Sequence, residues 1–313
     1  MNTVEQRAIL TLCLMAAFAD GGNSERERAE IKRIADTLSA DGALDVSAIY
    51  QDVLLRKPAL ATVAAAITQA DERQFAYEMA VCVCDADGAT SPAEREFLGR
   101  LAEALGLDAS AAQAFTEQAD ALTGAPLEGP ALDGAIVAAV PARAAELDRM
   151  ILNYSILNGA LELLPQSLAS MAIISLQMKM VYQVGKAHGF ELDRGHIKDL
   201  LATMGVGLTS QYVEQIGRKL LGGLLDRIGG GLLGGAGSAT TGAAFSFAST
   251  YALGHVAKRY YAGGRTIDAA GLQQAFTSLL GEAKQLQGKY TSQIAEQART
   301  LDVNKLLSAV RAP

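Results

Sequence analysis

Apolar residues recur at intervals of three and four along almost the whole chain of 313 residues. This spacing is the period of an α-helix, and no long stretch keeps the alternation that is typical of a β-strand. Half of the residues are hydrophobic, but only 5% are aromatic and none is Trp. Such a composition favours helices that pack through small side chains. The sequence therefore predicts an all-α fold with enough apolar surface for two cores.

The helical pattern is interrupted once, where three of the seven prolines and several glycines gather between residues 123 and 141. Such a cluster indicates a linker between domains. We predict the following organisation: an acidic helical domain over residues 1–122, a linker over 123–144, a second, Gly-rich helical domain over 145–265 and an amphipathic helical tail over 266–313.

The net charge of -7 hides an asymmetry between the two parts of the chain. Residues 1–128 carry 10 Lys and Arg against 21 Asp and Glu, whereas the remainder carries 17 against 13. Because contact with phosphates needs clustered basic residues, we expect no nucleic-acid partner. The mildly basic remainder suits an anionic membrane face, and membrane lipid is therefore a predicted partner.

The cysteines and the N-terminus point to a reducing compartment. Cys13, Cys82 and Cys84 provide no disulfide framework and no CxxC pair. The first residues read as an amphipathic helix, because an acidic residue precedes the apolar run and no cleavage signature follows it. These features predict a cytoplasmic protein.

Two segments of the acidic domain resemble each other. Residues 17–31 (AFADGGNSERERAEI) and 84–98 (CDADGATSPAEREFL) share the pattern D-G-x-x-S-x-x-E before an apolar helical face. Ser-x-x-Glu is typical of a capping box, and Pro92 stands at the favoured first helical position. One interpretation is therefore purely structural, with two helices that each begin after a tight turn.

The other interpretation of these turns is a divalent metal site. Carboxylate oxygens are the ligands that hard cations prefer. The two turns supply these candidate ligands: Asp20, Glu27, Asp85, Asp87 and Glu94. The second turn is not an EF-hand, because Gly88 stands fourth and Thr90 occupies the sixth position, where that loop needs Gly. The spacing leaves the metal open, with Ca²⁺ and Zn²⁺ as candidates.

The segments AFADGG and CDADGATSPAEREFLGRLAEALGL resemble the TerB family of tellurite-resistance-associated proteins, over about residues 1–122. The resemblance implies an all-helical fold with paired acidic turns. It also implies that divalent metal is bound through the five carboxylates named above. The first turn has Phe18 where the second has Asp85, so the two turns are not equivalent.

The second domain contains a Gly-rich stretch, with nine of the 31 glycines in residues 222–242. Neither the Walker pattern nor the dinucleotide-binding pattern is present in it. Pairs such as Gly230 and Gly234 are typical of close contacts between helices. Residues 228–257 carry no Asp, Glu, Lys or Arg, and basic and tyrosine residues flank them. Two interpretations stay open, a membrane-associated helical segment and a buried helical hairpin.

Residues 172–200, followed by the Gly-rich stretch and by TYALGHVAKRYYAGG, resemble the YcjF-type domain of unknown function over about residues 145–265. Domains of this type often follow small GTPase modules, and the resemblance implies association with a membrane. This chain contains no such GTPase module, so the resemblance implies no nucleotide-driven action here.

No arrangement of Ser, Cys and His predicts a catalytic site. We therefore predict a non-enzymatic adaptor or scaffold at the inner membrane of a bacterium, with a role in envelope or chemical stress. Its Gly-rich helices would mediate formation of a homo-oligomer, and its acidic head would bind metal or a partner protein. The alternative is a soluble divalent-metal-binding stress protein whose Gly-rich hairpin is part of the core. A third class, an enzyme with a cryptic site, would need paired carboxylates in a deep pocket.

Overall fold

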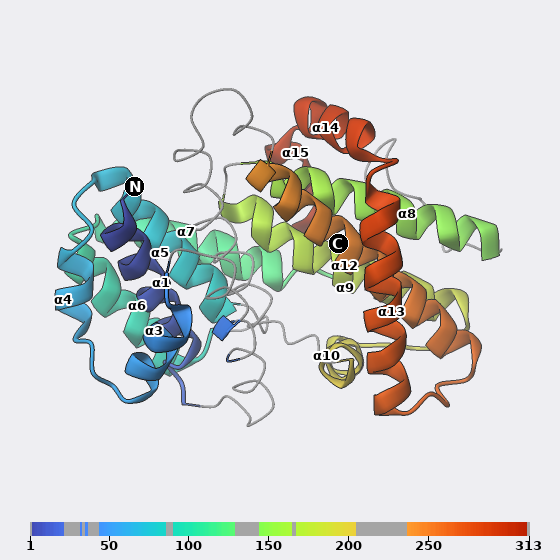
Figure 1. Cartoon of the computed structure of the whole chain (residues 1–313), viewed down its shortest axis with the longest axis horizontal. Coiled ribbons are helices and arrows are strands. Elements are labelled where there is room, and N and C mark those ends of the chain that lie inside the picture. The colour runs from blue at the N-terminus through green and yellow to red at the C-terminus, as the bar shows by residue number, and fades with distance from the viewer. Residues whose placement is uncertain are drawn as a thin grey trace. The chain divides into compact units, whose positions relative to one another are not determined.

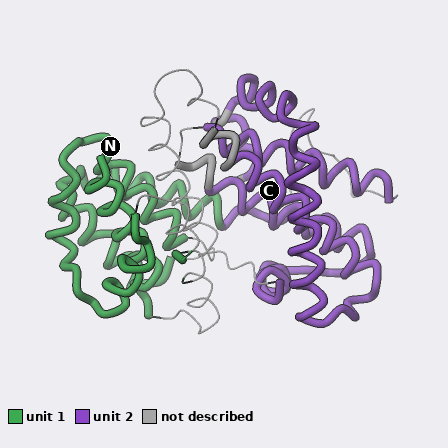
Figure 2. The backbone as a smooth tube through the Cα atoms, in the orientation of Figure 1, with its two compact units in different colours: residues 1–123, 207–238 green, residues 124–206, 239–313 purple. Residues whose placement is uncertain are grey.

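The computed structural model describes residues 2–21, 32, 35–36, 44–85, 90–128, 144–164, 167–204 and 237–311. These residues form thirteen helices and no strand, which confirms the predicted all-α fold (Figure 1). The chain divides into two compact units, which Figure 2 shows in different colours. The N-terminal unit comprises residues 1–123 with 207–238, and the C-terminal unit comprises residues 124–206 with 239–313.

The N-terminal unit is a bundle of short helices around α1. Its helices are α1 (Thr3–Ala17), α3 (Val46–Leu54), α4 (Leu60–Ala65), α5 (Ala70–Cys84), α6 (Pro92–Leu105) and α7 (Ala109–Thr123). Helix α1 packs against α3, α4 and α5, and eleven of its fifteen residues are buried. It is therefore the central helix of this unit rather than a surface helix with one apolar face.

The start of α1 is fixed by a buried carboxylate. Asn2 and Glu5 form a capping box, in which the Glu5 amide donates to the Asn2 side chain at 3.0 Å and the Asn2 amide donates to Glu5 at 2.9 Å. The Thr68 hydroxyl also donates to Glu5, at 2.8 Å. These hydrogen bonds lower the pKa of Glu5 to about 2, with the bond from the Asn2 amide as the largest cause.

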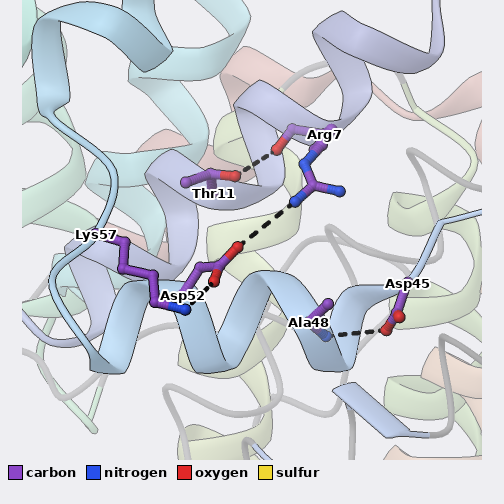
Figure 3. A network of polar contacts seen from close by, with 6 residues as sticks. All are labelled: Arg7, Thr11, Asp45, Ala48, Asp52 and Lys57. Atoms are coloured by element: carbon purple, nitrogen blue, oxygen red, sulfur yellow. Dashed lines mark hydrogen bonds and ion pairs between the residues drawn. The ribbon is translucent and has the colours of Figure 1, made fainter.

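Polar contacts join α1 to α3 on the surface of the unit (Figure 3). Asp52 accepts from Lys57 at 3.1 Å and lies 3.7 Å from Arg7, and all three side chains are exposed. Asp45 caps α3 by accepting from the amide of Ala48 at 2.9 Å. Exposed ion pairs contribute at most about 1 kcal/mol each. The packing of α3 on α1 therefore depends on buried apolar side chains rather than on this network.

The C-terminal unit is built around three long helices. Its helices are α8 (Ala144–Glu162), α9 (Ser167–Ala187), α10 (Arg194–Thr203), α12 (Gly237–Ala262), α13 (Ala269–Gln287), α14 (Thr291–Thr300) and α15 (Val303–Arg311). Residues 171–182 of α9 are all buried. The hydroxyl of Thr250 on α12 accepts hydrogen bonds from Asn158 on α8 and from Gln177 on α9, each at 3.0 Å. A buried polar contact thus links α8, α9 and α12.

Close packing through glycine is observed at Gly254 in α12. A Cβ atom at this position would lie 2.6 Å from Ile151 Cγ2 on α8 and 3.1 Å from Met180 Sδ on α9. Both distances are too short for a methyl group, so only glycine allows this approach of α12 to its neighbours. The predicted pairs within residues 222–235 lie outside the described residues.

Among the described residues, no helix is both long and apolar enough to cross a bilayer. Two side chains expected to face lipid headgroups have other contacts within the C-terminal unit. Lys258 binds Asp148 at 2.5 Å, and Tyr261 is 2% exposed with its ring 5.3 Å from that of Phe190. The predicted membrane association therefore gains no support from these two positions.

We predict that Gly254→Ala destabilises the protein by about 1–3 kcal/mol, because the added methyl group overpacks the contact between α12, α8 and α9. Gly281→Ala in α13 is the matched control. Nothing lies within 4 Å of a Cβ at that position, and alanine there favours the helix by about 0.5–1 kcal/mol. Urea unfolding of both variants measures the difference, and equal stabilities would contradict the close approach at Gly254.

Candidate functional site

The second acidic turn lies between α5 and α6 and is organised by the predicted capping box. The Glu94 amide donates to the Ser91 side chain at 3.2 Å, and the Ser91 amide donates to the Glu94 carboxylate at 2.7 Å. Pro92 occupies the first turn of α6. The local sequence thus forms the helix start that the structural interpretation predicted. The hydrogen bond from the Ser91 amide engages one carboxylate oxygen of Glu94.

The first acidic turn follows α1. Gly21 has a φ of 67°, in the left-handed region that favours glycine, and the exposed Asp20 precedes it. Glu27 of the first turn and Asp87 of the second lie outside the described residues. Their part in the predicted set of ligands stays a prediction.

The most distinctive group in the second turn is Asp85, which caps the C-terminus of α5 and is 0% exposed. Its Oδ1 lies 2.8 Å from the hydroxyl of Thr90, and the same hydroxyl lies 2.8 Å from Oδ1 of Asp120 on α7. Its Oδ2 has no hydrogen-bond partner among the described residues. Two carboxyl groups thus compete for the one hydrogen that a Thr hydroxyl can donate.

Burial, as the largest cause, and the neighbouring Asp120 carboxyl together raise the pKa of Asp85 to about 7. The ionised form is unfavourable because water is excluded and a like charge lies close by. At neutral pH, this carboxyl therefore holds a proton part of the time. A bound cation would replace that proton and stabilise the ionised form.

Three of the predicted ligands act electrostatically on one buried thiol, that of Cys84. Burial raises the pKa of Cys84, and the charges of Glu94, Asp85 and Asp20 raise it further. Asp85 and Glu94 belong to the second turn, whereas Asp20 belongs to the first. Neutral thiols are poor metal ligands, so any cation bound here would rely on oxygen atoms.

The described residues alone do not complete a metal site. No group of three or more His, Cys, Asp or Glu side chains among them is arranged to hold a metal ion. Glu94 is engaged in the capping box, and Asp85 is held by Thr90. The predicted ligand set can be complete only with the contributions of Glu27 and Asp87.

Sequence reasoning missed two members of this site, Thr90 and Asp120. In the sequence, Thr90 stands out only as the residue that breaks the EF-hand pattern. Asp120 is 35 positions from Asp85, and no local pattern connects the two residues. In the sequence, Asp120 stands between Ala119 and Ala121, and nothing there relates it to Asp85.

Residues 2–119 match the model of a family described as "Protein of unknown function (DUF533)". This family is TerB-like in general, which agrees with the coarser resemblance of the N-terminal part. The comparisons give no support for a YcjF-type domain in the C-terminal part. No curated protein and no solved structure matches the chain.

We predict that Asp85 makes the protein less stable as the pH rises from about 4 to about 7. Its pKa is about 7 in the folded state and about 3.8 when unfolded, so the folded state binds more protons in this window. The free energy of unfolding of Asp85→Asn, relative to that of the wild type, should therefore rise by on the order of 2–4 kcal/mol between pH 4 and pH 8.

Calorimetry in EDTA at several pH values measures this difference. Glu103→Gln, an exposed carboxylate on α6, is the control and should show no such trend. A stability difference between Asp85→Asn and the wild type that stays constant with pH would show that Asp85 is ionised throughout.

Proposed function

We propose that the protein is a non-enzymatic adaptor whose acidic N-terminal unit takes up a divalent cation at the turn between α5 and α6. The observation that carries the proposal is the buried carboxylate of Asp85, one of whose oxygens has no hydrogen-bond partner among the described residues. A buried charge is costly unless a proton or a counter-ion compensates it. The neighbouring Asp20 and Glu94 add negative charge around the same point.

The chemistry of the donors favours a hard cation. Asp20, Asp85 and Glu94, the described acidic residues whose charges act on Cys84, are carboxylates, and burial keeps the Cys84 thiol protonated. Oxygen ligands suit Ca²⁺, Mg²⁺ and Mn²⁺, whereas thiolate and imidazole suit Zn²⁺. Of the two metals considered from the sequence, Ca²⁺ is therefore the better candidate.

A cation bound at this turn would alter the contacts between α5, α6 and α7. Such a change could be transmitted to a bound partner protein, as the function of an adaptor requires. Asp85 ends α5, Glu94 belongs to the first turn of α6, and Asp120 lies on α7. A cation at Asp85 would weaken its contact with the Thr90 hydroxyl and relieve its repulsion with Asp120. We propose that the resulting change in this acidic surface controls the binding of a partner protein in a stress response.

For the full chain, we expect Ca²⁺ to raise the melting temperature relative to EDTA, and Zn²⁺ to do so less. A ligand at 100 times its Kd stabilises the folded state by about 2.7 kcal/mol. Asp87→Asn should remove the effect, whereas the exposed Glu103→Gln should keep it. A wild-type protein whose melting temperature is the same with Ca²⁺, Mg²⁺, Mn²⁺ and EDTA would overturn the cation proposal.

We propose, as a second function, that the C-terminal part associates with the inner membrane and forms homo-oligomers. The support is the sequence of residues 228–257, which lacks charged side chains over 30 positions. Part of this stretch forms α12, and the predicted small-residue pair Gly230 and Gly234 precedes that helix. Helices with such small-residue contacts are suited to self-association in lipid.

Flotation of the full chain with anionic liposomes, followed by an alkaline carbonate wash, tests this second function. Flotation that resists the wash is the result expected for an embedded segment. Flotation that the wash reverses would indicate an electrostatic, peripheral contact. Protein that stays at the bottom of the gradient as a discrete soluble species would refute membrane association. The cation-binding proposal for the N-terminal unit would then stand alone.

A further inference from the structure

A cluster of polar side chains lies inside the apolar core of the C-terminal unit, where α8, α9 and α12 meet. Its members, each at most 7% exposed, are Asn158, Glu162, Gln177, Ser246 and Thr250. Asn158 and Gln177 each donate to the Thr250 hydroxyl at 3.0 Å. The Ser246 hydroxyl donates to the Glu162 carboxylate, also at 3.0 Å. Three helices thus contribute polar atoms to this part of the core.

The two contacts between α8 and α12 lie on successive turns of both helices. Asn158 and Glu162 are four positions apart on α8, and Ser246 and Thr250 are four positions apart on α12. Residues with this spacing share one face of a helix and lie about 6 Å apart along its axis. Two oxygens on opposite sides of one bound cation are about 5 Å apart. The spacing of the two turns therefore suits a cation that lies between them.

Two acceptor oxygens in this polar cluster are buried without a partner. Oδ1 of Asn158 and Oε1 of Gln177 accept no hydrogen bond from any described residue. The amide nitrogens of both side chains bond to Thr250, whose hydroxyl has one hydrogen and can satisfy at most one of the two oxygens. A buried acceptor without a partner is unfavourable. These two atoms therefore indicate a ligand that coordinates oxygen or donates hydrogen bonds to it.

We propose that an alkali-metal cation, Na⁺ or K⁺, binds in this polar cluster. Its ligands are the amide oxygens of Asn158 and Gln177 and the carboxylate of Glu162, which are all hard oxygen donors. One carboxylate among neutral oxygens balances one positive charge, whereas a divalent cation would leave a net charge in the core. This site lies in the C-terminal unit and is separate from the divalent-cation site proposed for the N-terminal unit.

An ordered water is the other occupant that such oxygens accept. A water molecule donates two hydrogen bonds and could satisfy both amide oxygens. The carboxylate of Glu162 attracts a cation more strongly than a neutral molecule, and this attraction is larger in the protein interior than in water. The position is therefore assigned to a cation. A cluster that holds water alone would not distinguish one salt from another.

For the full chain in EDTA, we expect NaCl or KCl to raise the melting temperature by about 2–4 °C over choline chloride at equal ionic strength. This shift corresponds to a cation at about five times its Kd. Choline is the reference because a quaternary ammonium ion is too large for a buried site between packed helices. The salt with the larger shift identifies the preferred cation. Equal melting temperatures in all three salts would overturn the proposal.

Two variants test the ligands. Glu162→Gln removes the charge but keeps an oxygen next to Ser246, and Gln177→Met removes Oε1 with little change in volume. Both should lose the difference between sodium chloride and choline chloride. Glu282→Gln, an exposed carboxylate on α13, is the matched control and should respond as the wild type does. A Glu162→Gln variant that keeps the full response would contradict the assignment.

Broadening of the sodium NMR signal gives a readout that does not depend on stability. The wild type should broaden the signal, KCl should reverse the broadening by competition, and Gln177→Met should broaden it less. If the wild type leaves the signal unchanged and Gln177→Met destabilises the protein equally in all salts, the cluster holds a water and no cation. Asp87→Asn should keep the sodium response, which separates this site from the one proposed for the N-terminal unit.

Discussion

The C-terminal unit depends on one buried hydroxyl group, that of Thr250. It accepts hydrogen bonds from Asn158 and Gln177 and so joins α8, α9 and α12 at one level of the core. Gly254, one turn further along α12, allows the backbones to approach closely enough for these bonds to form. The remaining helices pack on this group, with α10 and α15 on α9 and α14 on α8. These contacts favour one register of the helices, because a shift would leave the Thr250 hydroxyl without the two amide groups that donate to it.

In the N-terminal unit, two buried carboxylates differ in their surroundings and therefore in their chemistry. Glu5 accepts hydrogen bonds from the Asn2 amide and from Thr68, which lower its pKa to about 2. Asp85 is buried beside Asp120, and its pKa rises to about 7. The first carboxylate holds a helix start in place, whereas the second carries a charge that a proton or a cation has to compensate. Only the second is suited to reversible binding, which is why we place the cation there.

Much of the fold could be predicted from the sequence, because its determinants are local. The 3–4 spacing of apolar residues predicted helices, and the pattern Ser-x-x-Glu predicted the capping box of Ser91 and Glu94. The contact between Asp85 and Asp120 could not be predicted, since it depends on how α5, α6 and α7 pack.

The sequence by itself determined that this chain is helical, that its acidic residues concentrate in the first part, and where individual helices begin. These properties follow from the period of the helix, from composition and from hydrogen bonds between residues a few positions apart. The tertiary structure alone decided that Asp85 and Asp120 contact the same Thr90 hydroxyl and that α12 approaches α8 and α9 closely at Gly254. Each of these depends on the distance between helices far apart in sequence, because burial and neighbouring charge arise only when such helices pack.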